Sequence, residues 1–211
     1  MSIVIRTPQN LISRHPDAFT VSLIFFLIGF MLGLQPEYSQ PIIEEAQKRQ
    51  IEPTATATNF KTILINNGLI SGIIWAGWFF TPFLGLAYLP PAIMVYNVGV
   101  AFGAVVSHVS AIQSIITIFS FGIIEALGFI FALSSSLLFP KYVLQKLLGK
   151  TVYFSETLTD AAASMLYSFL LISTGAVIEA LLINPVTQIL AIIIGTVTTI
   201  YIIKFLTKKV K

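Results

Sequence analysis

The chain alternates between long apolar runs and short polar segments, and the lengths of the apolar runs indicate membrane-spanning helices. A helix needs about 20 apolar residues to cross a bilayer. Six runs come near this length, at residues 18–35, 61–81, 87–107, 111–139, 162–183 and 186–203. We therefore expect an all-α protein, a single polytopic transmembrane bundle of about six spans over residues 1–211.

Two polar segments are long enough to contain structure of their own. Residues 36–60 form the predicted outer loop, in which SQPIIEEAQKRQ favours a short helix with Pro41 in its first turn and PTATATN follows as a tether. Residues 140–161 form the predicted inner segment, whose leucine and lysine spacing favours a short amphipathic helix on the inner leaflet. Neither segment can bury a core, so we expect no soluble domain.

Composition and charge support the membrane assignment and predict its orientation. Hydrophobic residues make up 56% of the chain and charged residues 10%, against about 25% charged in an ordinary soluble protein. If the N-terminus is cytoplasmic, nine of the 12 Lys and Arg residues lie on the cytoplasmic side. We therefore expect a multi-pass protein of the cytoplasmic membrane with both termini inside. The bilayer is its expected partner, and no basic aromatic patch favours nucleic acid.

Five Glu and Asn residues lie inside the predicted spans. Glu125 falls near the middle of the fourth span and Glu179 near the outer end of the fifth, while Asn66, Asn67 and Asn97 lie in the second and third. Apart from Lys61, the first residue of the second span, the spans contain no Lys or Arg to pair with the glutamates, and an unpaired carboxylate in an apolar setting is costly. We expect an intramembrane polar cluster in which Glu125 is protonated or accepts hydrogen bonds from the asparagine amides.

Such a cluster has two interpretations. Buried Glu and Asn can hold helices together, at about 1 kcal/mol each. The same groups can also bind a cation, a proton or a lipid headgroup. The fourth span has 29 residues, or about 43 Å of helix, so it must tilt, extend beyond the membrane, or break near Gly122 or Gly128. A break beside Glu125 favours a binding site.

Other candidate chemistry is sparse. The chain has no cysteine, which excludes disulfides and thiolate chemistry. His108, at the outer end of the third span, is a possible accessory residue, but only Glu125 or Glu179 could join it in a metal site, so we expect no metal. No catalytic or cofactor-binding motif is present, and we expect neither catalytic residues nor a cofactor.

Three predicted spans each carry two glycines four residues apart. Glycines at this spacing let two helices approach closely in a membrane. We expect at least one of the pairs to form such a crossing, within the chain or between two chains. The pairs are Gly29/Gly33, Gly68/Gly72 and Gly99/Gly103.

Four segments resemble the stage II sporulation protein M family, in family order across spans two to five. They are FKTILINNG (60–68), YNVGVAFG (96–103), FGIIEALGF (121–129) and AVIEALLINP (176–185). The family typically has His-Gly-x-x-Glu where this chain has Phe121, then Gly122 and Glu125 in the expected places. The resemblance implies a six-helix membrane protein that works with partners and has no established enzymatic reaction. The absent histidine weakens any mechanism that needs a His–Glu pair, unless His108 replaces it in space.

Two functional hypotheses follow. The first is a non-enzymatic membrane scaffold or complex subunit, assembling as a homodimer or with membrane-protein partners, in which the polar cluster fixes the bundle. The second is a transporter or permease-like subunit that binds a cation, a proton or a lipid headgroup at Glu125 and Glu179.

Overall fold

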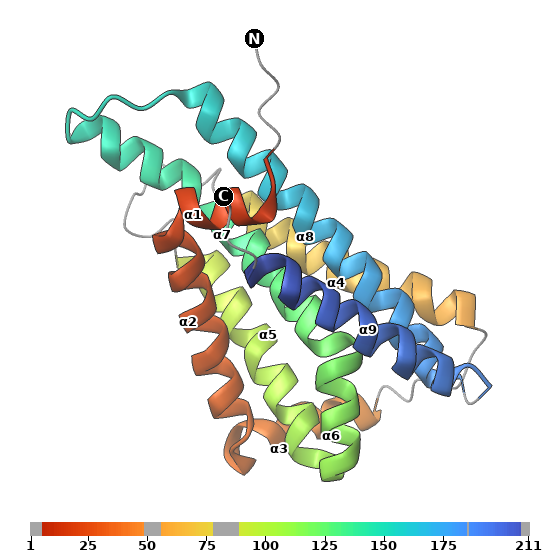
Figure 1. The fold of residues 1–211 in the computed structure, drawn as a ribbon. Helices are drawn as coiled ribbons and strands as arrows, with labels where there is room; N and C mark the ends of the chain where they lie inside the picture. The colour runs from red at the N-terminus through yellow and green to blue at the C-terminus, as the bar shows by residue number, and fades with distance from the viewer. Residues whose placement is uncertain (1–5, 49–55, 78–88, 185, 208–211) are drawn as a thin grey trace.

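The computed structural model describes residues 6–48, 56–77, 89–184 and 186–207, and within these ranges every regular element is a helix. Figure 1 shows the elements along the chain. They are α1 (Pro8–Arg14), α2 (Pro16–Gly33), α3 (Pro36–Lys48), α4 (Thr56–Ala76), α5 (Leu89–His108), α6 (Ala111–Thr117), the π-helical turn η2 (Ile118–Gly122), α7 (Ile123–Leu147), α8 (Phe154–Ile183) and α9 (Gln188–Thr207).

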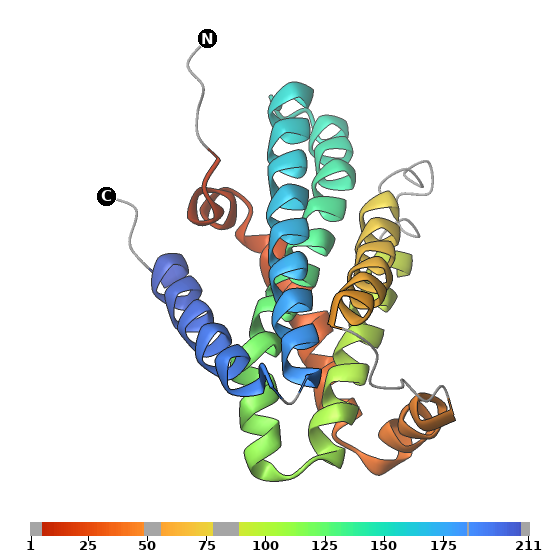
Figure 2. The same cartoon turned by 90° about the vertical axis from the view of Figure 1, so that its right-hand side faces the viewer.

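The long helices run between two ends of an elongated bundle. Figure 2 shows α3 and the α5–α6 turn at one end and the α7–α8 turn at the other. Five of the described helices are long and apolar enough to cross a membrane: α2, α5, the α6–α7 path, α8 and α9. The apolar part of α4, Phe60–Ala76, is shorter. The ends of the second and third predicted spans, residues 78–81 and 87–88, lie outside the described residues.

Helices α2 and α5 cross in direct backbone contact at two of the three predicted glycine pairs. A Cβ added to Gly29 would collide with the carbonyl oxygen of Tyr96, and one added to Gly99 would collide with that of Phe26. Gly33 and Gly103 make equivalent contacts one turn further along. The crossing therefore lies within the chain and needs glycine.

The third predicted pair, Gly68/Gly72, forms no such crossing in the described chain. No atom lies within 4 Å of a Cβ built on either glycine.

The fourth predicted span is a continuous helical path from Ala111 to Leu147, with a π-helical turn in place of a break. Ser110 begins the path with a capping box to Gln113. At η2 the N–H of Ile123 donates to the carbonyl of Ile118, five residues back, so the turn accommodates one extra residue. This turn ends three residues before Glu125.

The predicted amphipathic helix in residues 140–161 is wrong as a separate element. Helix α7 continues through Pro140 to Leu147, and α8 begins at Phe154, eight residues before the predicted span. Proline is tolerated inside membrane helices because neighbouring groups satisfy the freed backbone atoms. The helix ends instead at Leu147, and Gly149, two residues further on, has a φ of 73°, which suits a residue without a Cβ.

The segment before the first span and the outer loop at residues 36–60 also differ from the prediction. Helix α1 was not predicted; it lies crosswise to the long helices (Figure 2) and buries Leu11 completely. Helix α3 begins at Pro36, so Pro41 lies inside it and not in its first turn. The expected tether is helical from Thr56 onward, and residues 49–55 lie outside the described part of the chain.

Candidate functional site

Glu125 lies in the interior of the bundle where α4, α7 and α8 meet. Glu125 is 3% exposed. The Nδ2 of Asn67, on α4, donates a hydrogen bond of 3.0 Å to Glu125 Oε1. On the α8 side the Glu125 side chain lies directly against Gly175, and a Cβ at Gly175 would collide with its Cγ. The carboxyl group is therefore held between an amide and a glycine notch.

Glu179 places a second carboxyl group beside the first. It lies four residues after Gly175 on α8, and residues at that spacing share one face of a helix. The two glutamates interact electrostatically as like charges, and Glu179 is only partly buried. In the described part of the chain, no Lys, Arg or His forms an ion pair with either glutamate. We call Glu125, Glu179 and Asn67 the carboxyl site.

A hydroxyl contact fixes α4 in the position that the carboxyl site requires. Ser71 lies one turn after Asn67, and its Oγ is 3.0 Å from the Oγ of Ser168 on α8, with both residues buried. Ser168 is itself seven residues, or two turns, before Gly175. The same faces of α4 and α8 thus carry the serine pair and the carboxyl site.

Two of the predicted asparagines lie apart from the carboxyl site. Asn66 is exposed on α4, about 100° around the helix from Asn67. Asn97 is exposed on α5, whose glycine face packs on α2. Among the described residues, neither side chain hydrogen bonds to Glu125.

The histidine that the family motif would provide has no replacement at the carboxyl site. His108 is exposed at the end of α5, where its Nδ1 lies 3.0 Å from the carbonyl oxygen of Ala104. Phe121 packs in an apolar cluster with Ile124 and Ile178. Gly122 is buried at the end of η2, where a Cβ would press on the carbonyl oxygen of Thr117 at 3.1 Å. In the ranges that the structure describes, no three His, Asp, Glu or Cys side chains gather as metal ligands would.

A second polar group, which sequence reasoning missed, lies at the end of the bundle where α1 contacts the last turn of α9. Asp160, on α8, is 1% exposed and lies within ion-pair distance of two arginines and a histidine. Its Oδ1 is 2.6 Å from Arg6 Nε, and its Oδ2 is 3.2 Å from Arg14 Nε and 2.9 Å from His15 Nε2. Arg14 also reaches Glu156 at 3.3 Å. We call these residues the Asp160 network.

The Asp160 network attaches the N-terminal segment and α1 to α8. Tyr167 adds a hydrogen bond of 2.9 Å from its hydroxyl to the carbonyl oxygen of Arg6. The sequence signal for the Asp160 network is the presence of opposite charges at the same predicted membrane boundary. Arg6 and Arg14 indicate the orientation of the chain, but they also pair with an acid far along it.

The helices and the carboxyl site together indicate the class of protein. Five of the described helices have the length and apolarity of membrane spans, and the buried Glu125 accepts a hydrogen bond from one amide. This is a multi-pass helical membrane protein.

The chain belongs to the stage II sporulation protein M family, because the family model of that description matches residues 18–183. The match extends from α2 to the end of α8, so it includes the whole carboxyl site. No curated protein and no solved structure matches the chain.

Proposed function

We propose that this chain is a non-enzymatic integral membrane protein in which Glu125 and Glu179 bind a proton or a cation inside the bundle, as in a transporter or permease-like subunit. The observation that supports the proposal is the second acid. A purely structural partner for a buried carboxyl would be an amide or a hydroxyl, which Asn67 already supplies. Glu179 adds a like charge, which stabilises nothing by itself.

Two neighbouring carboxylates in an apolar bundle need neutralisation. When both are ionised they repel each other and lose hydration, and either a shared proton or a bound cation removes this cost. The amide of Asn67 orients Glu125, while Glu179 is partly exposed. We infer that a positive charge enters and leaves the pair through Glu179, the more exposed of the two acids.

Flux measurements in reconstituted vesicles test this function. Wild-type protein, Glu125→Gln and Glu179→Gln are placed in vesicles containing a pH-sensitive dye, and proton, Na⁺ and K⁺ gradients are applied in turn. We expect the wild type to dissipate at least one gradient and both variants to lose that activity while remaining folded. Glu37→Gln, at an exposed position on α3, is the matched control. Equal flux in wild-type and variant vesicles contradicts the proposal.

A second candidate function is a membrane scaffold or complex subunit, and one observation favours it. Glu125 contacts both Asn67 and Gly175, so one side chain joins α4, α7 and α8. In that role the carboxyl group of Glu125 holds the three helices together by its contacts. Glu125→Gln then keeps the fold and Glu125→Leu loses it, with no flux in any form. Co-purification of a stoichiometric membrane partner, or a homodimer in mild detergent, supports this candidate over the first.

A further inference from the structure

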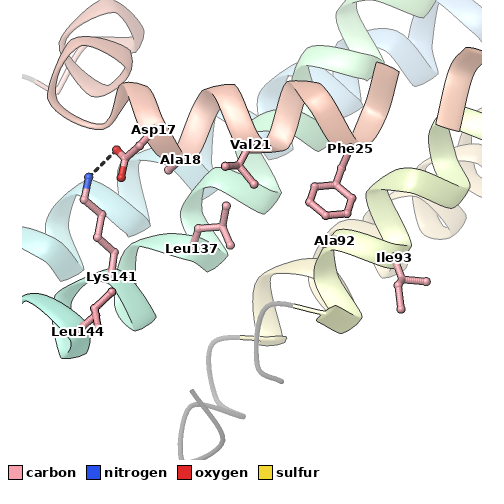
Figure 3. Close-up of a pocket in the computed structure, with 9 residues that line it drawn as sticks. All are labelled: Asp17, Ala18, Val21, Phe25, Ala92, Ile93, Leu137, Lys141 and Leu144. Atoms are coloured by element: carbon pink, nitrogen blue, oxygen red, sulfur yellow. Dashed lines mark hydrogen bonds and ion pairs between the residues drawn. The ribbon is translucent and has the colours of Figure 1, made fainter. Parts of the chain in front are cut away.

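A groove at the end of the bundle that carries the Asp160 network is apolar along its length and charged at one end. It lies between α2, α5 and α7 and has a volume of about 530 Å³. Its walls are formed by side chains such as Val21, Phe25 and Leu137. Asp17 and Lys141 stand together at one end, as Figure 3 shows, and Phe25, Ala92 and Ile93 lie toward the other. A groove with this polarity fits an amphipathic ligand.

The dimensions of the groove match part of one lipid chain. Asp17 and Phe25 are eight residues apart on α2, which corresponds to about 12 Å along the helix axis. This is close to half of a hydrocarbon core of about 30 Å. Asp17 lies in the first turn of α2, where the apolar span begins. The charged end of the groove is thus at the level of headgroups when its apolar part is at the level of acyl chains.

The two charges indicate which headgroup fits. Lys141 Nζ lies 2.6 Å from Asp17 Oδ1, and an ammonium has three N–H donors, so this contact leaves others for a phosphate oxygen. The side chain of Asp17 is 59% exposed, so a ligand ammonium can reach its carboxylate. An acid and a base side by side are complementary to a headgroup that carries a phosphate and a primary ammonium.

We propose that this groove binds one phospholipid of the surrounding leaflet with an ethanolamine-type headgroup. One acyl chain lies along Val21, Phe25 and Leu137. The phosphate accepts a hydrogen bond from Lys141, and the ammonium donates to Asp17. The lipid thereby bridges α2 and α7, and this role is independent of the carboxyl site.

Native mass spectrometry of the full chain in a lipid-free micelle tests the assignment. The protein is titrated with phosphatidylethanolamine, phosphatidylcholine and phosphatidylglycerol that have the same acyl chains. We expect one tight adduct, with phosphatidylethanolamine preferred by roughly three- to fivefold, the size of one exposed ion pair. Asp17→Asn should remove the preference over phosphatidylcholine, and Lys141→Gln should weaken all three lipids.

A groove-filling variant separates the acyl-chain contact from the charges. Val21→Trp fills the groove, while Ile24→Trp places the same ring at another exposed position of α2 outside it. We expect the adduct to be lost in Val21→Trp and kept in Ile24→Trp. Equal binding of the three lipids, or equal adducts in the two tryptophan variants, overturns the proposal. So does a lipid-insensitive dimer, since a second copy would then occupy the groove.

Discussion

Glu125 is the residue on which the proposed function depends, and Gly175 determines where its carboxyl lies. The absence of a side chain at Gly175 leaves the space that the Glu125 side chain occupies. A methyl group there must displace Glu125 at its Cγ, in the middle of the side chain, so the carboxyl moves relative to Asn67 and Glu179. The site thus depends on a residue that carries no chemistry of its own.

Gly175→Ala is expected to destabilise the protein by about 1–3 kcal/mol and to impair the carboxyl site. Thermal unfolding in detergent measures the first effect and the vesicle assay the second. The matched control is Gly72→Ala, because a Cβ at Gly72 has no neighbour within 4 Å in the described chain. Identical unfolding temperatures for the two variants would show that Glu125 does not need the notch.

Asp160 stabilises the attachment of α1 to α8 and is not part of the carboxyl site. Asp160→Asn keeps the shape of the side chain but removes the charge that Arg6, Arg14 and His15 share. We expect a loss of about 2 kcal/mol, since its partners are partly exposed and their interactions are partly screened. Proteolysis should cut the N-terminal segment faster in this variant. Unchanged proteolysis would contradict the proposed attachment of α1.

At this scale the sequence predicted the acids better than their partners. Glu125 is a single charge in a long apolar run, which is a strong signal. Choosing Asn67 over Asn66 requires the rotation of α4 about its axis, which depends on packing with α7 and α8. The position of Asn97 away from the carboxyl site could have been predicted from the sequence. It lies two residues, or about 200°, from Gly99, whose face of α5 packs on α2.

Among the elements, the α2–α5 crossing is the closest backbone contact that the glycines make. Gly29→Leu places a side chain against the Tyr96 carbonyl, so the helices must separate. We expect a loss of at least about 1–3 kcal/mol and much lower expression of folded protein. Gly68→Leu, at the glycine pair with no neighbour in the described chain, should be tolerated in the monomer. Detergent size-exclusion profiles of the two variants provide the comparison, and equal behaviour would contradict the assigned crossing.

The turn η2, which ends three residues before Glu125, packs directly against α9. A Cβ at Gly195 would collide with the carbonyl oxygen of Ser120, so α9 lies directly on the π-helical turn. Hydropathy predicts that residues 111–139 are apolar and too long for a simple span, but it contains no signal for one inserted residue. Likewise, the sequence predicts that the fourth span ends at residue 139, because sequence patterns do not show which neighbours satisfy the backbone groups freed at Pro140.

At the scale of the whole molecule, charged residues of both signs gather at one end of the bundle. Arg6, Arg14, Lys141 and Asp160 lie at the end where α9 also finishes, and Gln9 of α1 hydrogen bonds to the backbone of Phe205. The structure therefore places the described terminal segments together at one end of the bundle. The sequence predicts six spans with both termini cytoplasmic; five described helices have the length and apolarity of a span, and the orientation stays a prediction.

Cysteine labelling tests the predicted topology, since the natural chain has no cysteine. Ser13→Cys and Lys204→Cys should react with a membrane-impermeant maleimide only after cells are opened. Ser110→Cys, in the α5–α6 turn, should react in intact cells. Labelling of Ser13→Cys and Ser110→Cys from the same side would contradict the assigned path of the chain.

The central claim, that Glu125 and Glu179 form a site for a positive charge, is tested most directly by carbodiimide labelling. An apolar carbodiimide reacts with protonated carboxyl groups in apolar surroundings, and peptide mass spectrometry locates the adduct. We expect about one adduct per chain, on Glu125 or Glu179, decreasing as the pH rises and slowed by any cation that the site binds. Glu37, exposed on α3, should stay unmodified. No adduct on either glutamate at any pH, or equal modification of Glu37, would contradict the claim.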